Sequence, residues 1–334
     1  MPTVLAMLTT LGSPLQSGDQ VVEPIAHPDI EWSTITPMLV LAGTALVLMT
    51  ITAVVRTKPF AGFYAGVTSV AGLVAIGTAW PLWDRIQDAD RGPSTALAGA
   101  IGVDGFSVFL TVVIAISVII SALLADGYLR RENLDGPEFY VLLLLSASGG
   151  VLMASANDLV VLFLGLEILS LAVYVLAAMH LRRITSQEAG IKYFILGSFA
   201  SAFLLYGIAL TYGATGTTNL VEILDFLSAT VLFDNGLLMA GMAMLLVGLA
   251  FKVGAAPFHT WTPDVYEGAP TPVVAYMAGG VKAAGFAGLL RVFYLGFSTY
   301  RVDWQPAIYA LAVLTLLVGS LLALVQTDIK RMLA

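Results

Sequence analysis

The chain has 334 residues, of which 58% are hydrophobic and 11% are charged, with a formal net charge of -7 and a mean hydropathy of +0.91. A soluble protein of this length carries more charge and fewer long apolar runs. The acidic balance argues against nucleic-acid binding. The lack of cysteine excludes disulfides, thiol nucleophiles and cysteine-ligated iron–sulfur clusters in this chain. The composition predicts an all-α polytopic membrane protein.

Apolar runs long enough to cross about 30 Å of hydrocarbon recur along the chain. The N-terminal tail, 1–33, has a short apolar run without a positively charged region, which makes it a weak signal-peptide candidate. Hydropathy predicts nine spans, with boundaries uncertain by a few residues. They are 34–55, 60–80, 101–125, 137–154, 157–180, 188–212, 236–267 with an interruption, 272–297 and 305–326.

The placement of basic residues predicts the orientation of these spans. The connection after the first span carries Arg56 and Lys58, whereas the tail and the 213–235 loop carry no lysine or arginine. Further basic residues alternate along the chain in the same sense. We therefore expect a multi-pass protein of a bacterial cell membrane with its N-terminus outside.

The segment FKVGAAPFHTWTPDVYEGAPTP, 251–272, follows directly on an apolar run. Proline removes a backbone donor and clashes with the preceding turn, so the pattern predicts a helix that is interrupted near Ala255–Pro257. Broken backbone at membrane depth persists only where protein buries it or where it lines water. The interruption is therefore predicted to be a functional feature.

Ionisable side chains inside predicted spans are costly and are functional candidates by default. Glu167, in VLFLGLEILSLAVYVLAA, and Lys282, in VVAYMAGGVKAAGFAGLLRVF, are each about ten residues into a span, near the bilayer centre. Glu167 could instead be a structural carboxylate bonded to a neighbouring helix, and Lys282 could belong to a buried salt bridge with no further role. Asp104, Arg291 and Asp264 are predicted to be structural.

Three further residues have a structural and a functional interpretation. Lys252, at the interruption, could cap the carbonyls of the first half-helix, take part in transfer, or do both. Lys192, about one turn inside its span, could extend to the interface or belong to the site. His259 could be a loop residue or a proton relay. The three histidines of the chain are too far apart in sequence to suggest a metal site.

A carboxylate and several lysines in the membrane suggest proton transfer. Burial disfavours the charged form of lysine, and a nearby carboxylate favours it again. If the carboxylate moves or changes its charge, the lysine therefore takes up or releases a proton. An arginine would stay charged. The chain has no nucleotide motif and no redox ligands, so a partner or an ion gradient must supply the energy.

Five segments resemble the antiporter-like membrane subunits of proton-pumping NADH:quinone oxidoreductase (respiratory complex I), and among them the subunit N family. They are LFLGLEILSLAVYVLAA (162–178), SQEAGIKYFILGSFASAFLLYGIAL (186–210), FKVGAAPFHTWTPDVYEGAPTPVVA (251–275), GGVKAAGFAGLLRVF (279–293) and QTDIKRMLA (326–334). The resemblance covers roughly 100–334, and the first 100 residues match only in hydropathy.

The resemblance implies a translocase subunit that passes protons by charge switching between Glu167 and Lys252. Lys192 would assist this pair and Lys282 would be the central relay. His259 is added to this set as a proton relay on its own chemistry, not on the resemblance. The chain itself would hold no cofactor. NADH, flavin, iron–sulfur clusters and quinone are expected in partner subunits, and the expected partners are the other membrane subunits and the lipid bilayer.

The resemblance also implies a domain organisation. The tail 1–33 would be extracytoplasmic, 34–125 would form three leading helices, and 137–297 would form the first of two inverted five-helix repeats. Only the first helix of the second repeat would be present, in 305–334, so we expect a fragment or a C-terminally truncated product. Two alternatives remain open: a subunit of a cation/proton antiporter, and an inactive structural fragment.

Overall fold

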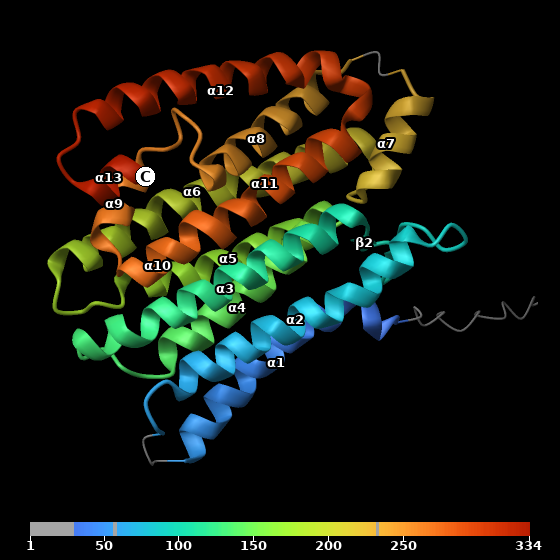
Figure 1. Ribbon diagram of the computed structural model, residues 1–334. Helices are drawn as coiled ribbons and strands as arrows, with labels where there is room; N and C mark the ends of the chain where they lie inside the picture. The colour runs from blue at the N-terminus through green and yellow to red at the C-terminus, as the bar shows by residue number, and fades with distance from the viewer. Residues whose placement is uncertain (1–29, 56–58, 232–233) are drawn as a thin grey trace, which may run out of the picture.

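The computed structural model describes residues 30–55, 59–231 and 234–334. This part of the chain forms a bundle of long helices that lie side by side (Figure 1). Nine helical segments in it are long and apolar enough to cross a membrane. The prediction of an all-α polytopic membrane protein is confirmed. Most of the tail 1–33, together with Arg56 and Lys58, lies outside the described residues.

The spanning segments follow the predicted order. The first six are α1 (Trp32–Val54), α2 (Phe63–Gln87), α3 (Gly105–Arg131), α4 (Glu138–Ser155), α5 (Leu159–Ala178) and α6 (Ile184–Thr215). The seventh is α8 (Gly236–Val253). The eighth consists of α10 (Thr271–Tyr276), the π-helical η1 (Met277–Val281), α11 (Lys282–Leu290) and the π-helical η2 (Arg291–Gly296). The ninth combines the short η3 (Ser298–Tyr300) with α12 (Arg301–Leu324).

Five shorter elements lie between or after these segments. An antiparallel hairpin joins β1 (Ser94–Ala96) to β2 (Ile101–Val103). Three short helices complete the described chain: α7 (Leu220–Ala229), α9 (Trp261–Gly268) and α13 (Ile329–Leu333). The bundle thus has two distinct ends. We call the end with the hairpin and α7 the acidic end, and the end with Arg183, Lys330 and Arg331 the basic end (Figure 1).

The start of the third span differs from the prediction. Hydropathy placed it at residue 101, but β2 occupies 101–103 and α3 begins at Gly105. The reason is a reciprocal cap: the Ser107 N–H donates to Asp104 Oδ1 at 2.7 Å, and the Asp104 N–H donates to Ser107 Oγ at 3.1 Å. Hydropathy alone cannot detect such a start. It also missed α7 within the 213–235 loop and ended α2 at 80 instead of Gln87.

Glycines allow the central helices to pack closely. A Cβ at Gly149 of α4 would lie 2.5 Å from the backbone nitrogen of Leu169 in α5, and one at Gly165 would lie 2.7 Å from that of Met153. Gly207 and Gly241 permit a similar approach of α6 to α8. Small residues drive helix association in membranes because they let the backbones come into contact. The core of the molecule is therefore the α4–α5 and α6–α8 packing.

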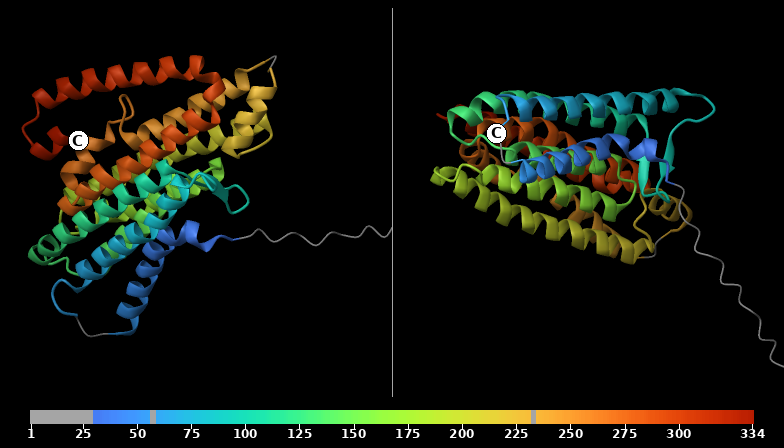
Figure 2. Two further views of the ribbon diagram at one scale, coloured as in Figure 1. Left: turned by 45° about the vertical axis from the view of Figure 1, so that its right-hand side comes forward. Right: turned by 90° about the horizontal axis from the view of Figure 1, so that it is seen from below.

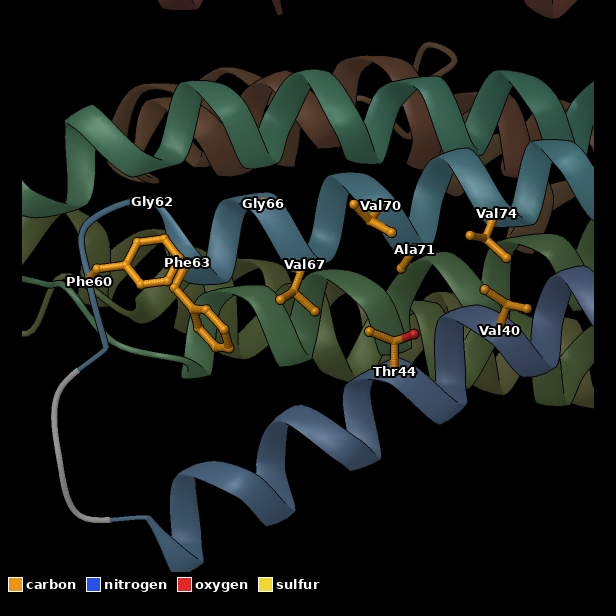
Figure 3. Close-up of a pocket in the computed structure, with 10 residues that line it drawn as sticks. All are labelled: Val40, Thr44, Phe60, Gly62, Phe63, Gly66, Val67, Val70, Ala71 and Val74. Carbon is orange, nitrogen blue, oxygen red and sulfur yellow. The ribbon is translucent and has the colours of Figure 1, made fainter.

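Two edges of the bundle are less tightly packed. The helices α1 and α2 diverge around an opening of about 480 Å³ (Figure 3). Its lining is apolar apart from Thr44, so it offers no charge chemistry. On the other side α12 runs along the outside of the bundle (Figure 2), and none of its most apolar stretch is buried. The charged candidates lie between these two edges.

Candidate functional site

The seventh predicted span consists of two helices separated by a non-helical segment. The first, α8, ends at Val253, where Gly254 adopts a φ of +77°, and α9 begins only at Trp261. The indole Nε1 of Trp261 donates to the Phe251 carbonyl at 3.1 Å, and the Ala256 N–H donates to Thr315 Oγ1 of α12 at 2.9 Å. Side chains of the protein thus form hydrogen bonds with backbone groups of the interruption, which lipid could not do.

Lys252 lies in the last turn of α8, directly before the interruption, and is only 2% exposed. Its ammonium donates to Ser170 Oγ at 2.7 Å and to the Tyr193 hydroxyl at 3.3 Å. It also lies 5.5 Å from the centre of the Tyr193 ring, within the range of a cation–π contact. The direct partners of this buried ammonium are therefore neutral.

Glu167 lies on α5, three residues before Ser170 and on the same face of the helix. Its Oε1 accepts a hydrogen bond of 2.5 Å from Ser201 Oγ of α6. Both Glu167 and Lys252 are described, and they form no direct ion pair; Ser170, three residues after Glu167 on α5, binds the Lys252 ammonium instead. The carboxylate and the ammonium are thus bound by different hydroxyls, those of Ser201 and Ser170.

Lys282 lies on α11, opposite Lys252. A Cβ at Gly285 would be 3.4 Å from Lys252 Cγ, and a Cβ at Gly254 would be 3.9 Å from Lys282 Nζ. The two lysines thus flank a contact between α8 and α11 that glycines keep open. The Lys282 ammonium lies 5.2 Å from the centre of the Tyr266 ring, and within the described chain no carboxylate pairs with it.

Lys192 has a different environment. Because α6 begins at Ile184 and not at residue 188, Lys192 lies about two turns from the start of the helix and not about one. Its ammonium pairs at 2.6 Å with Glu188 of the same helix and at 2.6 Å with Asp264 of α9. It therefore connects α6 to α9 near the basic end, and no contact joins its described side chain to Glu167 or Lys252.

The ion pairs of Lys192 continue into the C-terminal helix. Arg331 of α13 pairs with Asp264 at 3.0 Å and with Glu267 at 2.5 Å. The Lys330 ammonium donates to the carbonyls of Glu267 at 2.9 Å and Ala269 at 2.8 Å. We call Glu188, Lys192, Asp264, Glu267 and Arg331 the rim network. The sequence suggested a structural role for Asp264 but not these partners.

His259 lies in the interruption and is half-buried, with no hydrogen-bond partner at Nδ1 among the described atoms. It lines a cavity of about 350 Å³ together with Gly254 and Arg331. Gly254 is also the residue that faces Lys282. The cavity therefore brings a histidine from the interruption close to the lysine pair and to the rim network.

Sequence reasoning missed the hydroxyl partners in this site, namely Ser170, Tyr193 and Ser201. The i,i+3 spacing of Glu167 and Ser170 was available as a signal. No comparable spacing pointed to Tyr193 or Ser201. Over 30–55, 59–231 and 234–334, no group of three histidine, aspartate or glutamate side chains is placed to hold a metal ion. The chemistry that the arrangement supports is the binding and release of protons at buried lysines.

Comparisons with known proteins identify the family to which the chain is similar. A family model described as NADH:quinone oxidoreductase/Mrp antiporter, TM, matches residues 156–334. NADH-quinone oxidoreductase subunit N from Trichlorobacter lovleyi is 39% identical over 307 residues, which cover 91% of this chain and 61% of that protein. The protein of the same name from Parafrankia is 41% identical over 342 residues, which cover 93% and 63%.

Two solved structures have a similar fold. A chain of respiratory complex I from Thermus thermophilus with bound aureothin aligns with a TM-score of 0.73 and 35% identity, covering 89% of this chain and 60% of that one. A chain of the archaeal membrane-bound sulfane sulfur reductase aligns with a TM-score of 0.74 and 25% identity, covering 90% and 61%. The chain thus spans 60% to 63% of the length of these four proteins.

Proposed function

Because the chain belongs to the NADH:quinone oxidoreductase/Mrp antiporter transmembrane family, we propose that it is a proton-translocating membrane subunit of an NADH:quinone oxidoreductase. The observation that carries the proposal is the environment of Lys252, a buried ammonium with neutral hydroxyl partners and an offset carboxylate, Glu167. The similarity to proteins named subunit N supports the choice of complex.

In this proposal Glu167 and Lys252 form the switching pair. When Glu167 is ionised and close, it stabilises the protonated ammonium of Lys252; when Glu167 is protonated or moves away, Lys252 releases its proton. Lys282 receives it across the glycine-lined contact of α8 with α11. His259 exchanges protons with the aqueous side through its cavity.

Lys192 has a positioning role in this proposal. Its ion pair with Asp264 holds α9 against α6, its pair with Glu188 lies within α6, and neither pair involves Glu167 or Lys252. Partner subunits supply NADH oxidation, flavin, iron–sulfur clusters and quinone reduction. The energy that drives each proton, about 2.3 kcal/mol per 100 mV, therefore reaches this chain through its contacts with membrane partners.

We also propose the orientation and the organisation that the sequence suggests. The basic end faces the cytoplasm of a bacterial cell, and the N-terminus lies outside. Residues 34–125 are three leading helices, 137–297 are a five-helix repeat, and 305–334 begin a second one. Cysteine labelling from either side of the membrane tests the orientation, because the chain has no native cysteine.

The proposal is tested with Lys252→Met and Glu167→Gln in the assembled complex. Each change removes a charge at similar volume, so we expect proton translocation and quinone reduction to fall together by at least about tenfold. Lys330→Met is the matched control, because its ammonium binds only backbone carbonyls of the α9 region. Normal translocation in both site variants would contradict the proposal.

A second candidate is a subunit of a cation/proton antiporter, since the family description includes the Mrp antiporters. The two candidates share the lysine and glutamate chemistry. They differ in the coupled reaction: loss of an antiporter subunit impairs growth in sodium, whereas loss of an oxidoreductase subunit impairs NADH oxidation. A deletion strain that grows poorly in sodium but oxidises NADH normally would favour the antiporter.

A further inference from the structure

A cavity of about 410 Å³ lies at the acidic end, where the start of α3 meets η2. Its position is close to the end of the eighth spanning segment, which ends at Gly296. This places the cavity at the level of the lipid headgroups, where aromatic residues are typically found. It is lined by Asp104, Phe106, Leu290, Arg291, Tyr294 and Leu295.

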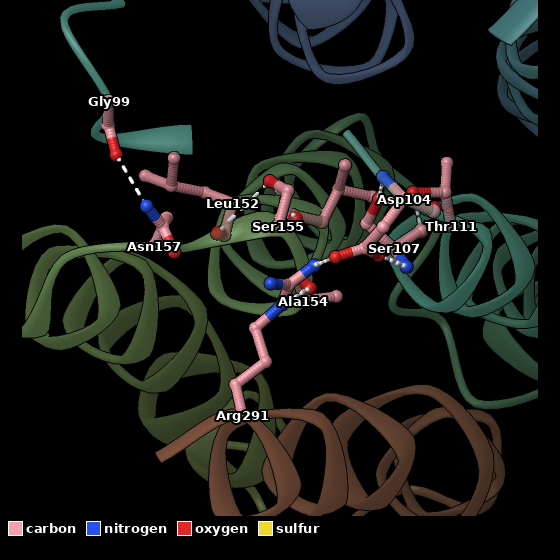
Figure 4. A network of polar contacts seen from close by, with 10 residues as sticks. Gly99, Asp104, Ser107, Thr111, Leu152, Ala154, Ser155, Asn157 and Arg291 are labelled. Atoms are coloured by element: carbon pink, nitrogen blue, oxygen red, sulfur yellow. Dashed lines mark hydrogen bonds and ion pairs between the residues drawn. The ribbon is translucent and has the colours of Figure 1, made fainter. Parts of the chain in front are cut away.

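Both members of an ion pair line this cavity. Arg291 Nη2 donates to Asp104 Oδ2 at 2.7 Å, and Arg291 Nε donates to the Ala154 carbonyl at 2.5 Å (Figure 4). The guanidinium side chain is 4% exposed, while the carboxylate side chain is 33% exposed. The cavity thus offers a fixed positive charge and a more accessible negative charge side by side.

The guanidinium of Arg291 is held firmly in place, but not all of its N–H donors form hydrogen bonds with described residues. A Cβ at Gly102 would lie 3.0 Å from Arg291 Nη1, so β2 passes close to the group and limits its movement. No hydrogen bond joins Nη1 to any described residue, and Figure 4 shows bonds from the other two nitrogens. A buried guanidinium with remaining donor capacity is able to bind one more oxygen acceptor.

The other walls of the cavity are apolar and partly open to the lipid. Tyr294 is 58% exposed, and Leu290 and Phe106 extend the surface along the bundle. The buried ring of Trp304 packs 5.7 Å from the Tyr294 ring and supports it from the inside. The π-helical turn of η2 contributes Arg291, Tyr294 and Leu295 to the cavity, and Leu290 is the last residue of α11 before it. Such π-helical turns often lie at functional sites.

From these observations we propose that the cavity binds the headgroup of a zwitterionic phospholipid with a primary ammonium, as in phosphatidylethanolamine. The phosphate accepts from the Arg291 guanidinium, and the ammonium donates to the Asp104 carboxylate. A purely anionic headgroup would be repelled by the negative charge of Asp104. A trimethylammonium headgroup has no N–H to donate to that carboxylate. The acyl chains then lie over Phe106, Leu290 and Tyr294.

The proposal is tested by lipid retention. The full chain is reconstituted in nanodiscs with equal amounts of phosphatidylethanolamine, phosphatidylcholine and phosphatidylglycerol, released into detergent, and examined by native mass spectrometry. We expect phosphatidylethanolamine to be retained about tenfold over each of the others, as one extra charge-assisted hydrogen bond allows. Equal retention of the three lipids would overturn the proposal.

A matched pair of variants tests whether the retained lipid binds in this cavity. Leu290→Trp fills the cavity, whereas Phe286→Trp adds similar bulk one turn earlier on the same helix, at a position that is 49% exposed and outside the cavity. We expect only Leu290→Trp to abolish the preference. If both variants or neither abolish it, the retained lipid binds elsewhere.

A charge variant tests the pairing of headgroup and protein. Asp104→Asn keeps an oxygen that can cap α3 but removes the negative charge from the cavity. We expect the preference to shift about tenfold towards phosphatidylglycerol, since Arg291 is then uncompensated. An unchanged preference for phosphatidylethanolamine in this variant would overturn the role of Asp104.

Discussion

Two lysines of neighbouring helices show how differently one side chain can be used. Lys252 is 2% exposed, and its ammonium is bound by the hydroxyls of Ser170 and Tyr193. The side chain of Lys192 is 41% exposed and has two carboxylates at 2.6 Å. When Lys192 loses its proton, Glu188 loses its cationic partner and Asp264 keeps only Arg331, whereas the hydroxyls around Lys252 do not depend on its charge. We infer that the rim lysine holds structure and the interior lysine exchanges protons.

Among variants that test this comparison of Lys252 with Lys192, Ser170→Ala is expected to have the largest effect on stability and translocation. It removes the shorter of the two hydrogen bonds to Lys252 and leaves the ammonium with the Tyr193 hydroxyl at 3.3 Å. Loss of a hydrogen bond to a buried charge costs about 1.5–3 kcal/mol. We expect a lower melting temperature in detergent and slower translocation.

Ser198→Ala is the control for that variant. Its hydroxyl is on α6, is exposed, and donates only to the carbonyl of Phe194 in the same helix. Because water and backbone replace such a bond easily, neither melting nor translocation should change measurably. An equal loss in both variants would mean that Ser170 supports only the helix and not Lys252.

A smaller effect is expected from Lys192→Met. The change removes two partly exposed ion pairs of the rim network, each worth about 0.2–1 kcal/mol. We expect a small loss of stability that fades in high salt, with translocation within about twofold of the unmodified chain. Loss of translocation comparable to that of Lys252→Met would break the comparison, because Lys192 would then belong to the switching pair.

The smallest effect is expected at the basic end, where Glu132, directly after α3, contacts the loop between α5 and α6. A hydrogen bond with His180 and the charge of Arg183 hold the pKa of Glu132 below its ordinary value of 4.5. A carboxylate with a lowered pKa in the folded state contributes stability that is present above the unfolded pKa and is lost as the pH falls through the folded one. Glu132→Gln should therefore be slightly less stable than the unmodified chain at neutral pH.

That difference should begin to shrink when the pH falls below about 4.5 and should disappear once the pH is below the lowered pKa of Glu132 in the folded state. Melting temperatures measured at pH 7 and at about pH 3 check it. Glu222→Gln at the acidic end serves as the control, since Glu222 accepts only from the Thr217 hydroxyl. A difference of constant size at all pH values would show that the ion pair at Glu132 does not contribute.

Hydropathy and the cost of buried charge predicted much of this molecule. The spans follow from apolar runs, and Glu167, Lys252 and Lys282 stand out because few ionisable residues lie so deep in them. The interruption follows from Pro257 and the polar residues after it, although only the structure shows that it extends from Gly254 to Thr260.

The parts that sequence reasoning missed depend on contacts between distant segments. Serine and tyrosine are common in helices, so nothing marked Ser170 and Tyr193 as partners of a lysine 82 and 59 residues away. The link from Lys192 to Asp264 crosses 72 residues. The start of α3 depends on a local cap that hydropathy does not detect. Such pairings are set by how the helices pack, and a single sequence does not record that.

The most direct test of the account is a double-variant cycle of Glu167→Gln and Lys252→Met, with proton translocation measured in proteoliposomes that contain the assembled complex. If the two residues act as one unit, the double variant should lose no more translocation than the more severe single variant, because either change already disables the pair. If the two losses multiply, Glu167 and Lys252 act independently, and the proposal of a switching pair is wrong.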